Sequence, residues 1–388
     1  MIDYNVVYVA IWIMAIFSVF IRSDWSRYLF YIQATFMALF LAFRFETGYD
    51  WPVYKSHYLH VAAGEPFQLD FEIGYEYLVR IFTFLGFEFH QFVALLSVLE
   101  ILLIAVSVRF FFRKHSLWVM ALLYSIPDFY LIPSFSLVRQ ALAASLFFYG
   151  LHYYARARLF TALGIFVLAV SVHYSVVGAI AFLVLAMRVK LSKYVFVVLF
   201  AVAVTLYLFS IDVARFFANF VVLYFYPKYM FYLERDVYNA SFVYRLVYAA
   251  VSTLVFALIY NSWDKRLVDS SGFSKWDSTV YRLAMFGVLI PLVVFGFPTF
   301  STRYQYFFCF FMVGVSLSVL VLFNARDRLA IMLAVCVISY VSFYRFLVNP
   351  LSIVYVPYQS QFLYDEKNST GQKRTDDLLH QLEILWLK

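Results

Sequence analysis

The sequence predicts an all-α, polytopic integral membrane protein, and three observations support this fold class. The 388-residue chain is 64% hydrophobic and 22% aromatic but only 14% charged, which is far from the composition of a soluble domain. Its apolar stretches are continuous runs of helical length, whereas the strands of an outer-membrane barrel alternate apolar and polar residues. Its two cysteines, Cys309 and Cys336, both lie inside apolar runs, so neither a disulfide framework nor a metal site is expected.

About twelve apolar segments are candidate transmembrane helices, although several are shorter than a full bilayer crossing. The N-terminus lacks the basic region of a cleaved signal peptide, so the first segment is expected to be retained. Residues 159–172 and 175–187 could also form one long helix interrupted at Ser171-Val172-His173. We separate them because the basic loops then alternate properly. The candidate segments are residues 4–21, 28–43, 90–110, 117–133, 137–154, 159–172, 175–187, 194–211, 242–261, 280–297, 303–323 and 329–348.

The orientation follows from the short loops, which carry most of the basic residues, for example Arg113 and Lys114. By the positive-inside rule these loops face the cytoplasm, so the N-terminus faces out. The net charge of +7 therefore reports topology and does not indicate nucleic-acid binding.

The outward loops, residues 44–89 and 212–241, are long and rich in aromatic residues, which places the working surface outside. We expect residues 1–350 to form a single transmembrane domain and residues 351–388 a C-terminal tail. Thr375 could cap a short amphipathic helix in this tail.

Within the first outward loop, Phe71, Tyr75, Leu78 and Phe82 recur at spacings of three and four. This spacing predicts an amphipathic helix over residues 71–86 that lies along the membrane interface.

Arginine recurs at the outer ends of predicted spans, at Arg44, Arg139, Arg245 and Arg303, against the usual charge bias. A guanidinium inside the membrane is costly, so it indicates function by default. Arginine suits bidentate contact with phosphate, and the set therefore predicts a phosphate or pyrophosphate anchor. Two alternatives stay open: Arg139 could snorkel to the headgroups, or each arginine could pair with an acid of the 44–89 loop and only fix that loop.

Three residues are candidates for a general base. His173 interrupts two apolar runs at the outer surface, where a neutral imidazole could accept a proton, although a lone histidine is often structural. Asp50 and Glu72 are the carboxylate alternatives. Asp50 could instead form a turn, and Glu72 could cap the 71–86 helix. His57 and His60 are three residues apart, but no metal-ligand pattern accompanies them.

Several short motifs recur in a defined order over roughly residues 40–360. They are Arg44-(three residues)-Gly48-Tyr49-Asp50-(three)-Tyr54, Glu72-Ile73-Gly74-Tyr75, Val138-Arg139-Gln140-Ala141-Leu142-Ala143, Val172-His173-Tyr174-Ser175, Arg303-Tyr304-(two)-Phe307 and Tyr355-Val356-Pro357-Tyr358. In order and spacing they resemble the motifs of EpsG-type proteins, which are members of the Wzy class of bacterial polysaccharide polymerases. Tyr49 departs from the pattern, because a small or polar residue is expected there.

The resemblance implies a GT-C-type glycosyltransferase on the outer side of the bacterial inner (cytoplasmic) membrane. Such a polymerase transfers a growing glycan from polyprenyl (undecaprenyl) pyrophosphate to the non-reducing end of a lipid-linked repeat unit, and it uses neither a nucleotide sugar nor a metal or other cofactor. The expected partners are these lipid-linked repeat units, the bilayer, a chain-length regulator and a flippase, with no nucleic acid. The implied roles are pyrophosphate binding by Arg139, Arg303, Arg245 and Arg44, proton transfer by His173, Asp50 or Glu72, and sugar or loop contacts by Gln140, Tyr54, Tyr75, Tyr304 and Tyr358.

Two other readings compete with the polymerase. A ligase of the same class, which transfers the finished glycan to another acceptor, typically carries a large outward domain, whereas residues 212–241 are a short loop. A lipid-linked oligosaccharide flippase or other transporter predicts charges near mid-bilayer and discontinuous helices in paired positions. The charges here are expected at the outer rim, which favours the polymerase.

Overall fold

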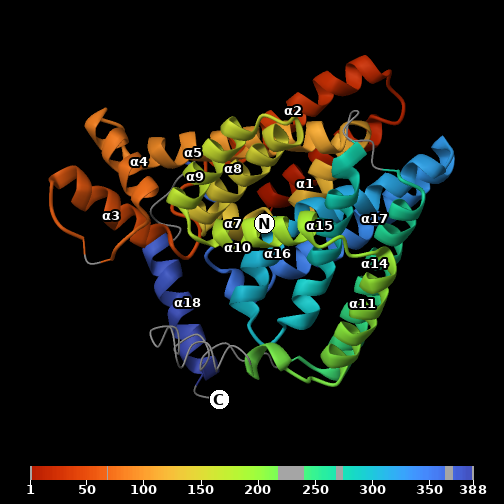
Figure 1. The fold of residues 1–388 in the computed structure, drawn as a ribbon. Coiled ribbons are helices and arrows are strands. Elements are labelled where there is room, and N and C mark those ends of the chain that lie inside the picture. Colours follow the sequence, from red (N-terminus) through yellow and green to blue (C-terminus); the bar gives the residue numbers. More distant parts are fainter. Residues whose placement is uncertain (1, 68, 217–239, 268–273, 363–369, 387–388) are drawn as a thin grey trace. The chain divides into compact units, whose positions relative to one another are not determined.

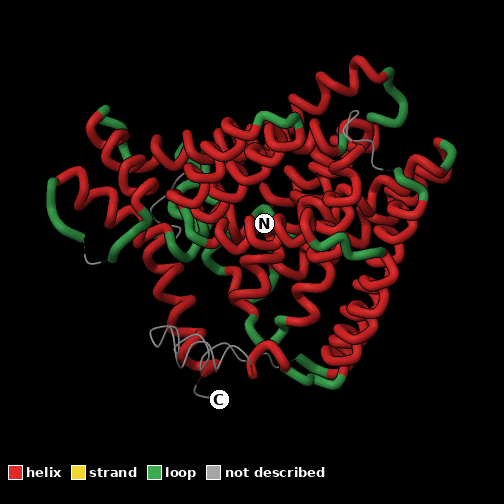
Figure 2. The backbone as a smooth tube through the Cα atoms, in the orientation of Figure 1, coloured by secondary structure: helices red, strands yellow, loops and turns green. Residues whose placement is uncertain are grey.

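The computed structural model describes residues 2–67, 69–216, 240–267, 274–362 and 370–386. Figure 2 shows that helices dominate these residues. The described part of the chain contains no β-strand, and an isolated bridge between Arg44 and Ser360 is the β-type pairing found there. The all-α prediction is therefore confirmed.

The chain divides into two compact units, Met1–Val176 with Phe323–Lys388, and Val177–Leu322. The first unit contains the candidate site. Its helices, labelled in Figure 1 where space allows, are α1 (Ile2–Phe17), α2 (Ser23–Ala42), α3 (Trp51–Ala63), α4 (Ile73–Phe84), α5 (Phe89–Phe111), η1 (Arg113–His115), α6 (Ser116–Ser125), α7 (Leu131–Phe135), α8 (Val138–Ala155), α9 (Leu159–Val172), α17 (Ala325–Leu347), η4 (Pro350–Ser352) and α18 (Gly371–Trp386).

The second unit is also built of apolar helices. Within it Arg282 of α15 donates hydrogen bonds to the carbonyls of Ala186 (2.9 Å) and Leu191 (3.2 Å). These carbonyls lie in and after the last turn of α10, where a helix leaves acceptors unpaired. Its helices are α10 (Ser175–Arg188, which begins at the end of the first unit), α11 (Lys193–Leu208), α14 (Phe242–Asp264), α15 (Ser274–Val293), α16 (Pro298–Leu317) and η3 (Ser318–Leu322).

Every predicted apolar segment contains a helix, and α9 and α10 are separate helices, as expected from the break at His173. Residues 117–133 are the exception to a single helix, because α6 ends at Ser125 and α7 begins at Leu131. Pro127 lies in this gap, and proline interrupts helical hydrogen bonding.

Four described helices are long and apolar enough to cross a membrane: Phe89–Phe111, Phe242–Asp264, Phe300–Leu322 and Ala325–Leu347. Five further apolar helices are shorter. The chain is thus an all-helical membrane protein, and the number of twelve spans and the GT-C architecture stay predictions.

The helix predicted at residues 71–86 forms as α4, but the face predicted for the membrane packs on protein. Tyr75 is buried against Tyr54, and Phe82 lies 5.1 Å from Phe92 of α5 between ring centroids. A different apolar face is exposed, formed by Ile73, Tyr77, Ile81, Phe84 and Leu85. The periodicity predicted the helix correctly. It did not show which face packs on protein, because both faces are apolar.

The tail helix α18 begins at Gly371, four residues before the predicted cap Thr375. Thr370 supplies the cap instead, since its Oγ1 accepts from the backbone N–H of Lys373 (3.2 Å). Arg374 is buried and donates to the carbonyls of Glu46 and Pro357. These bonds attach the tail to the first outward loop, so the tail and that loop lie on one face of the unit.

The second predicted outward loop, residues 212–241, falls largely outside the described residues. That this loop is part of an outward working surface therefore stays a prediction.

Candidate active site

Several helices of the first unit begin close to one another, and four of the predicted site residues lie at these helix ends. Tyr54 is in the first turn of α3, Glu72 is the N-cap of α4, Arg139 is in the first turn of α8, and His173 comes two residues before α10. Helix N-termini carry partial positive charge and unpaired N–H groups. Their convergence produces an electrostatic environment that favours an anion.

Arg139 is the centre of this cluster. Its Nη1 donates to Glu72 Oε2, and its Nε donates to the Tyr54 hydroxyl (3.4 Å). Its side chain is 21% exposed, and its Nη2 group has no hydrogen-bond partner among the described residues. A guanidinium with two bonded nitrogens and one remaining donor group can still bind a phosphate oxygen.

Aromatic rings surround the guanidinium. Its Cζ lies 4.3 Å from the ring centroid of Phe71, 5.6 Å from that of Tyr54 and 5.8 Å from that of Tyr75. Cation–π contacts of this kind hold a planar guanidinium in place. Burial raises the pKa of Tyr54 to about 12, so its hydroxyl stays neutral beside Arg139.

Glu72 joins the guanidinium to the imidazole. It occupies the N-cap position of α4, but its side chain makes no capping hydrogen bond. The carboxylate is 10% exposed and lies against Arg139 through Oε2 and 3.6 Å from His173 Nδ1 through Oε1. Glu72 thus lies at the N-cap position that the capping alternative predicted, although without a capping hydrogen bond. The alternative in which Arg139 pairs with an acid of the 44–89 loop describes part of the geometry.

The His173 ring is oriented by the start of α10. Its Nδ1 accepts a hydrogen bond from the backbone N–H of Ser175 (3.1 Å), so that nitrogen carries no proton and the neutral ring is protonated at Nε2. His173 Nδ1 and Glu72 Oε1 lie 3.6 Å apart, so they are close to each other but not hydrogen-bonded. Among the three candidate bases, this geometry favours Glu72.

Two glycines of the motifs permit the close approach. Gly48 has φ +107°, and a Cβ there would lie 2.8 Å from the carbonyl carbon of Phe135, just before α8. A Cβ on Gly74 would lie 2.7 Å from the carbonyl carbon of Ser171 and 2.8 Å from its Cβ. Gly74 thus lets α4 pack on the end of α9, which brings Glu72 to His173.

Arg44 lies elsewhere in the unit. It is only 5% exposed and donates to the Leu41 carbonyl and to Ser97 Oγ, both at 2.7 Å. Its Cζ lies 5.2 Å from the Phe135 ring centroid. This enclosure contradicts the prediction that Arg44 binds pyrophosphate, because a lipid diphosphate cannot reach a guanidinium held inside the protein.

The remaining residues predicted in this unit are Tyr75, Gln140, Asp50 and Tyr358. Tyr75 and Gln140 are buried, and Asp50 is the N-cap of α3 without a side-chain capping bond. The hydroxyl of Tyr358 donates to the Phe40 carbonyl (2.7 Å), and its ring stacks on Phe40. Tyr358 is thus tied to α2, and its assignment as a sugar or loop contact stays a prediction.

Arg245, Arg303 and Tyr304 belong to the second unit. Arg245 lies in the first turn of α14 and Arg303 in the second turn of α16, and these two helices pack against each other. The Tyr304 ring lies against that of Phe300, with centroids 4.3 Å apart and an interplanar angle of 35°. Their grouping with Arg139 around one pyrophosphate stays a prediction.

Sequence reasoning missed Phe71 as a site residue. It gives Arg139 its closest ring contact, and its place directly before Glu72 was the available signal. Among the described residues, no group of three or more His, Cys, Asp or Glu side chains is arranged to bind a metal ion.

The described part of the chain is thus a helical membrane protein with an arginine–carboxylate cluster at the ends of several helices. The chain matches the EpsG family over residues 27–360 and therefore belongs to that family, which is a family of Wzy-type polymerases. No curated protein and no solved structure matches the chain.

Proposed function

We propose that this protein is a polysaccharide polymerase that transfers a growing glycan from polyprenyl pyrophosphate to the non-reducing end of a lipid-linked repeat unit. Membership of the EpsG family supports polymerisation. The observation that carries the proposed chemistry is the contact of Arg139, Glu72 and His173 at the convergent helix ends. The site would act at the extracytoplasmic face of the bacterial inner membrane, as the positive-inside rule predicts.

A glycosyl pyrophosphate donor requires a site that binds the anionic leaving group more than it requires a strong acid to protonate that group. A glycosyl pyrophosphate already has a good leaving group, so catalysis depends on stabilising the charge that develops on the departing phosphates. Arg139 and the helix N-termini around it supply fixed positive charge and N–H donors for this purpose.

Glu72 is the proposed general base. When phosphate oxygens bind the guanidinium of Arg139, they compete with Glu72 for it, and the released carboxylate can accept a proton. The acceptor hydroxyl oxygen then forms a bond to the anomeric carbon while the bond from that carbon to the phosphate oxygen breaks. The electron pair leaves with the pyrophosphate, and the hydroxyl proton passes to Glu72. This single displacement inverts the anomeric configuration.

His173 has a positioning role in this scheme. Its Nδ1 is occupied by the Ser175 N–H, so the ring packs beside Glu72 and limits where the carboxylate can move.

The test is a reconstitution of the purified protein in nanodiscs with lipid-linked repeat units. We expect a ladder of lengthened glycans on the polyprenyl carrier, and loss of this ladder in Arg139→Ala with insertion unchanged. Transfer of the glycan to a separate acceptor such as lipid A core, without any ladder, would contradict the polymerase and support the ligase.

A further inference from the structure

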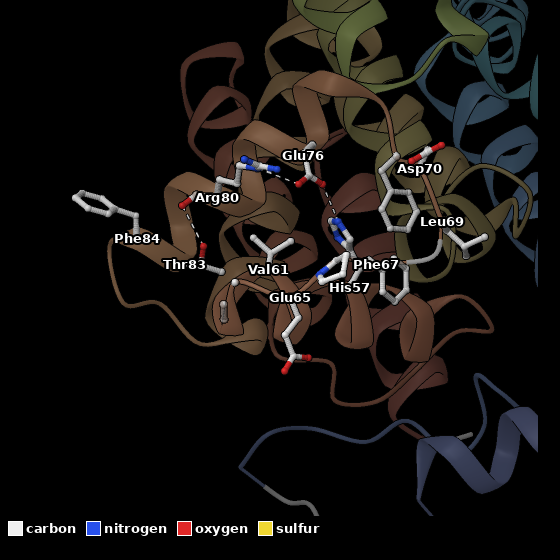
Figure 3. A pocket seen from close by; sticks show the side chains of 14 residues that line it. His57, Val61, Glu65, Phe67, Leu69, Asp70, Glu76, Arg80, Thr83 and Phe84 are labelled. Atoms are coloured by element: carbon white, nitrogen blue, oxygen red, sulfur yellow. Dashed lines mark hydrogen bonds and ion pairs between the residues drawn. The ribbon is translucent and has the colours of Figure 1, made fainter.

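A hollow of about 870 Å³ lies beside the candidate active site, between α3, the segment after it and α4. Its volume falls within the roughly 300–1,000 Å³ of sites for small ligands. Figure 3 shows the side chains that surround it. The lining of this α3–α4 hollow consists of His57, Val61, Ala62, Gly64, Glu65, Pro66, Phe67, Leu69, Asp70, Phe71, Glu76, Arg80, Thr83 and Phe84.

The wall of the hollow combines aromatic rings with carboxylates. The rings of Phe67 and Phe71 are nearly parallel, with an interplanar angle of 15° and centroids 6.0 Å apart. Glu65, Asp70 and Glu76 contribute acceptors to the same lining. Sugars present apolar C–H faces and hydroxyl donors together, so a wall of rings and carboxylates matches both features.

A hydrogen-bonded chain of three side chains holds one wall in place (Figure 3). His57 of α3 and Glu76 of α4 are joined at 2.7 Å through Nε2 and Oε2, and Arg80 Nε donates to Glu76 Oε1 at 3.0 Å. His57 is 2% exposed, and its Nδ1 has no hydrogen-bond partner among the described residues. The His57 ring lies against Phe67 and Phe71, with centroids 5.2 Å and 4.4 Å away, so it adds a polar ring to the aromatic wall.

Phe71 connects the hollow to the candidate active site. Its ring lies 4.4 Å from the His57 ring between centroids, and it also lies under the Arg139 guanidinium. The next residue in the chain is Glu72. A glycan whose reacting end is at Arg139 and Glu72 can therefore continue into the hollow across one side chain.

We propose that the α3–α4 hollow is a glycan-binding subsite that holds neutral sugar residues adjacent to the one that reacts. The role of the hollow in polymerisation rests on the proposed polymerase function, whereas glycan binding by the hollow does not. Three carboxylates, Glu65, Asp70 and Glu76, face one guanidinium, Arg80, in the lining. The excess of negative charge selects against uronic acids and other anionic sugars. The bound residues belong either to the growing chain or to the incoming repeat unit.

Binding is tested on the full chain in nanodiscs with an array of neutral and uronate-containing oligosaccharides. Wild type should retain at least one neutral oligosaccharide, with at least tenfold weaker retention by Phe67→Ala and by Asp70→Asn. Phe160→Ala is the matched control, because Phe160 is 93% exposed on α9 and does not line the hollow; it should bind like wild type. Absence of neutral binding by wild type, preference for uronates, or equal binding by Phe67→Ala would overturn the proposal.

Product length and KM in the polymerisation assay show whether the hollow holds the growing chain or the incoming repeat unit. If the hollow holds the growing chain, Phe67→Ala joins the first two repeat units normally but yields shorter final products. If it holds the incoming unit, the variant raises KM for that unit at every length. Unchanged lengths and KM in a variant that has lost glycan binding would contradict the subsite. A wild type that binds glycans but never lengthens them refutes the polymerase and leaves the binding site standing.

Discussion

Arg44 and Arg139 occupy similar places in the sequence, at the outer ends of predicted spans, yet their surroundings differ. Arg44 is 5% exposed and bonds to a carbonyl and a serine inside the unit. Arg139 is 21% exposed at a convergence of helix N-termini, and its partner is a carboxylate that we propose phosphate replaces. We infer that an arginine at the membrane surface indicates an anion site only when the acceptors of its hydrogen bonds can be replaced by the anion.

The largest effect is expected at Arg139. Arg139→Ala should lower the rate of chain lengthening by about 10³-fold, because removing a fixed donor to developing charge typically costs about 10²–10³-fold. Arg139→Lys should restore only part of the rate, since an ammonium lacks the planar fork. The measurement is the ladder assay in nanodiscs, with folding checked by thermal melting. Normal polymerisation by Arg139→Ala would show that Arg139, like Arg44, is not required for catalysis.

Glu72 sharpens the comparison, because in the described part of the chain Arg44 donates to the Leu41 carbonyl and to Ser97, and not to an acid. Glu72→Gln should reduce the rate by about 10²-fold, as expected for loss of a general base, while the Arg139 side chain stays in place. Single-turnover rates at saturating donor should show the loss in kcat. A loss confined to donor KM would instead assign Glu72 to binding alone.

Gly74→Ala tests whether packing creates the cluster. The new methyl group would collide with Ser171 and move Glu72 away from His173, so we expect about a tenfold lower rate, since a displacement of about 1 Å in an active site is costly. The matched control is Gly86→Ala in the same unit, where a Cβ meets nothing within 4 Å but φ is +76°. It should lower stability slightly and leave the rate per folded molecule unchanged.

The corresponding change at Arg44 should affect stability and not turnover. Arg44→Gln loses hydrogen bonds from a charged group, each worth about 1.5–3 kcal/mol, so the thermal midpoint in detergent should fall. The rate per folded molecule should remain within about twofold of wild type. A folded but inactive Arg44→Gln would restore the pyrophosphate assignment.

The smallest effect is a pH dependence at His57. Burial lowers the pKa of His57 from 6.5 in the folded protein, against the opposing influence of Glu76. The unfolded chain therefore binds the proton more readily, so stability is fully present above pH 6.5 and falls as the pH drops through the folded pKa. Melting curves between pH 7.5 and pH 5 should show this loss in wild type and less of it in His57→Gln. Identical pH profiles would exclude His57 as the source.

The sequence was sufficient for the helices and for part of the site. Apolar runs of helical length predicted the helices of the candidate spans but not α3, which lies inside the first outward loop. The motifs containing Glu72, Arg139 and His173 lie together in the structure. It could not separate Arg44 from Arg139, because burial depends on contacts such as Arg44 with Ser97, which are distant along the chain. It also could not identify the buried face of α4, since both faces are apolar.

The central claim is tested most directly by comparing Arg139→Gln with Arg44→Gln in the same nanodisc polymerisation assay, normalised to folded protein. The account predicts no ladder from Arg139→Gln and a wild-type ladder from Arg44→Gln. Equal activity of the two variants, or loss of the ladder only in Arg44→Gln, would contradict it.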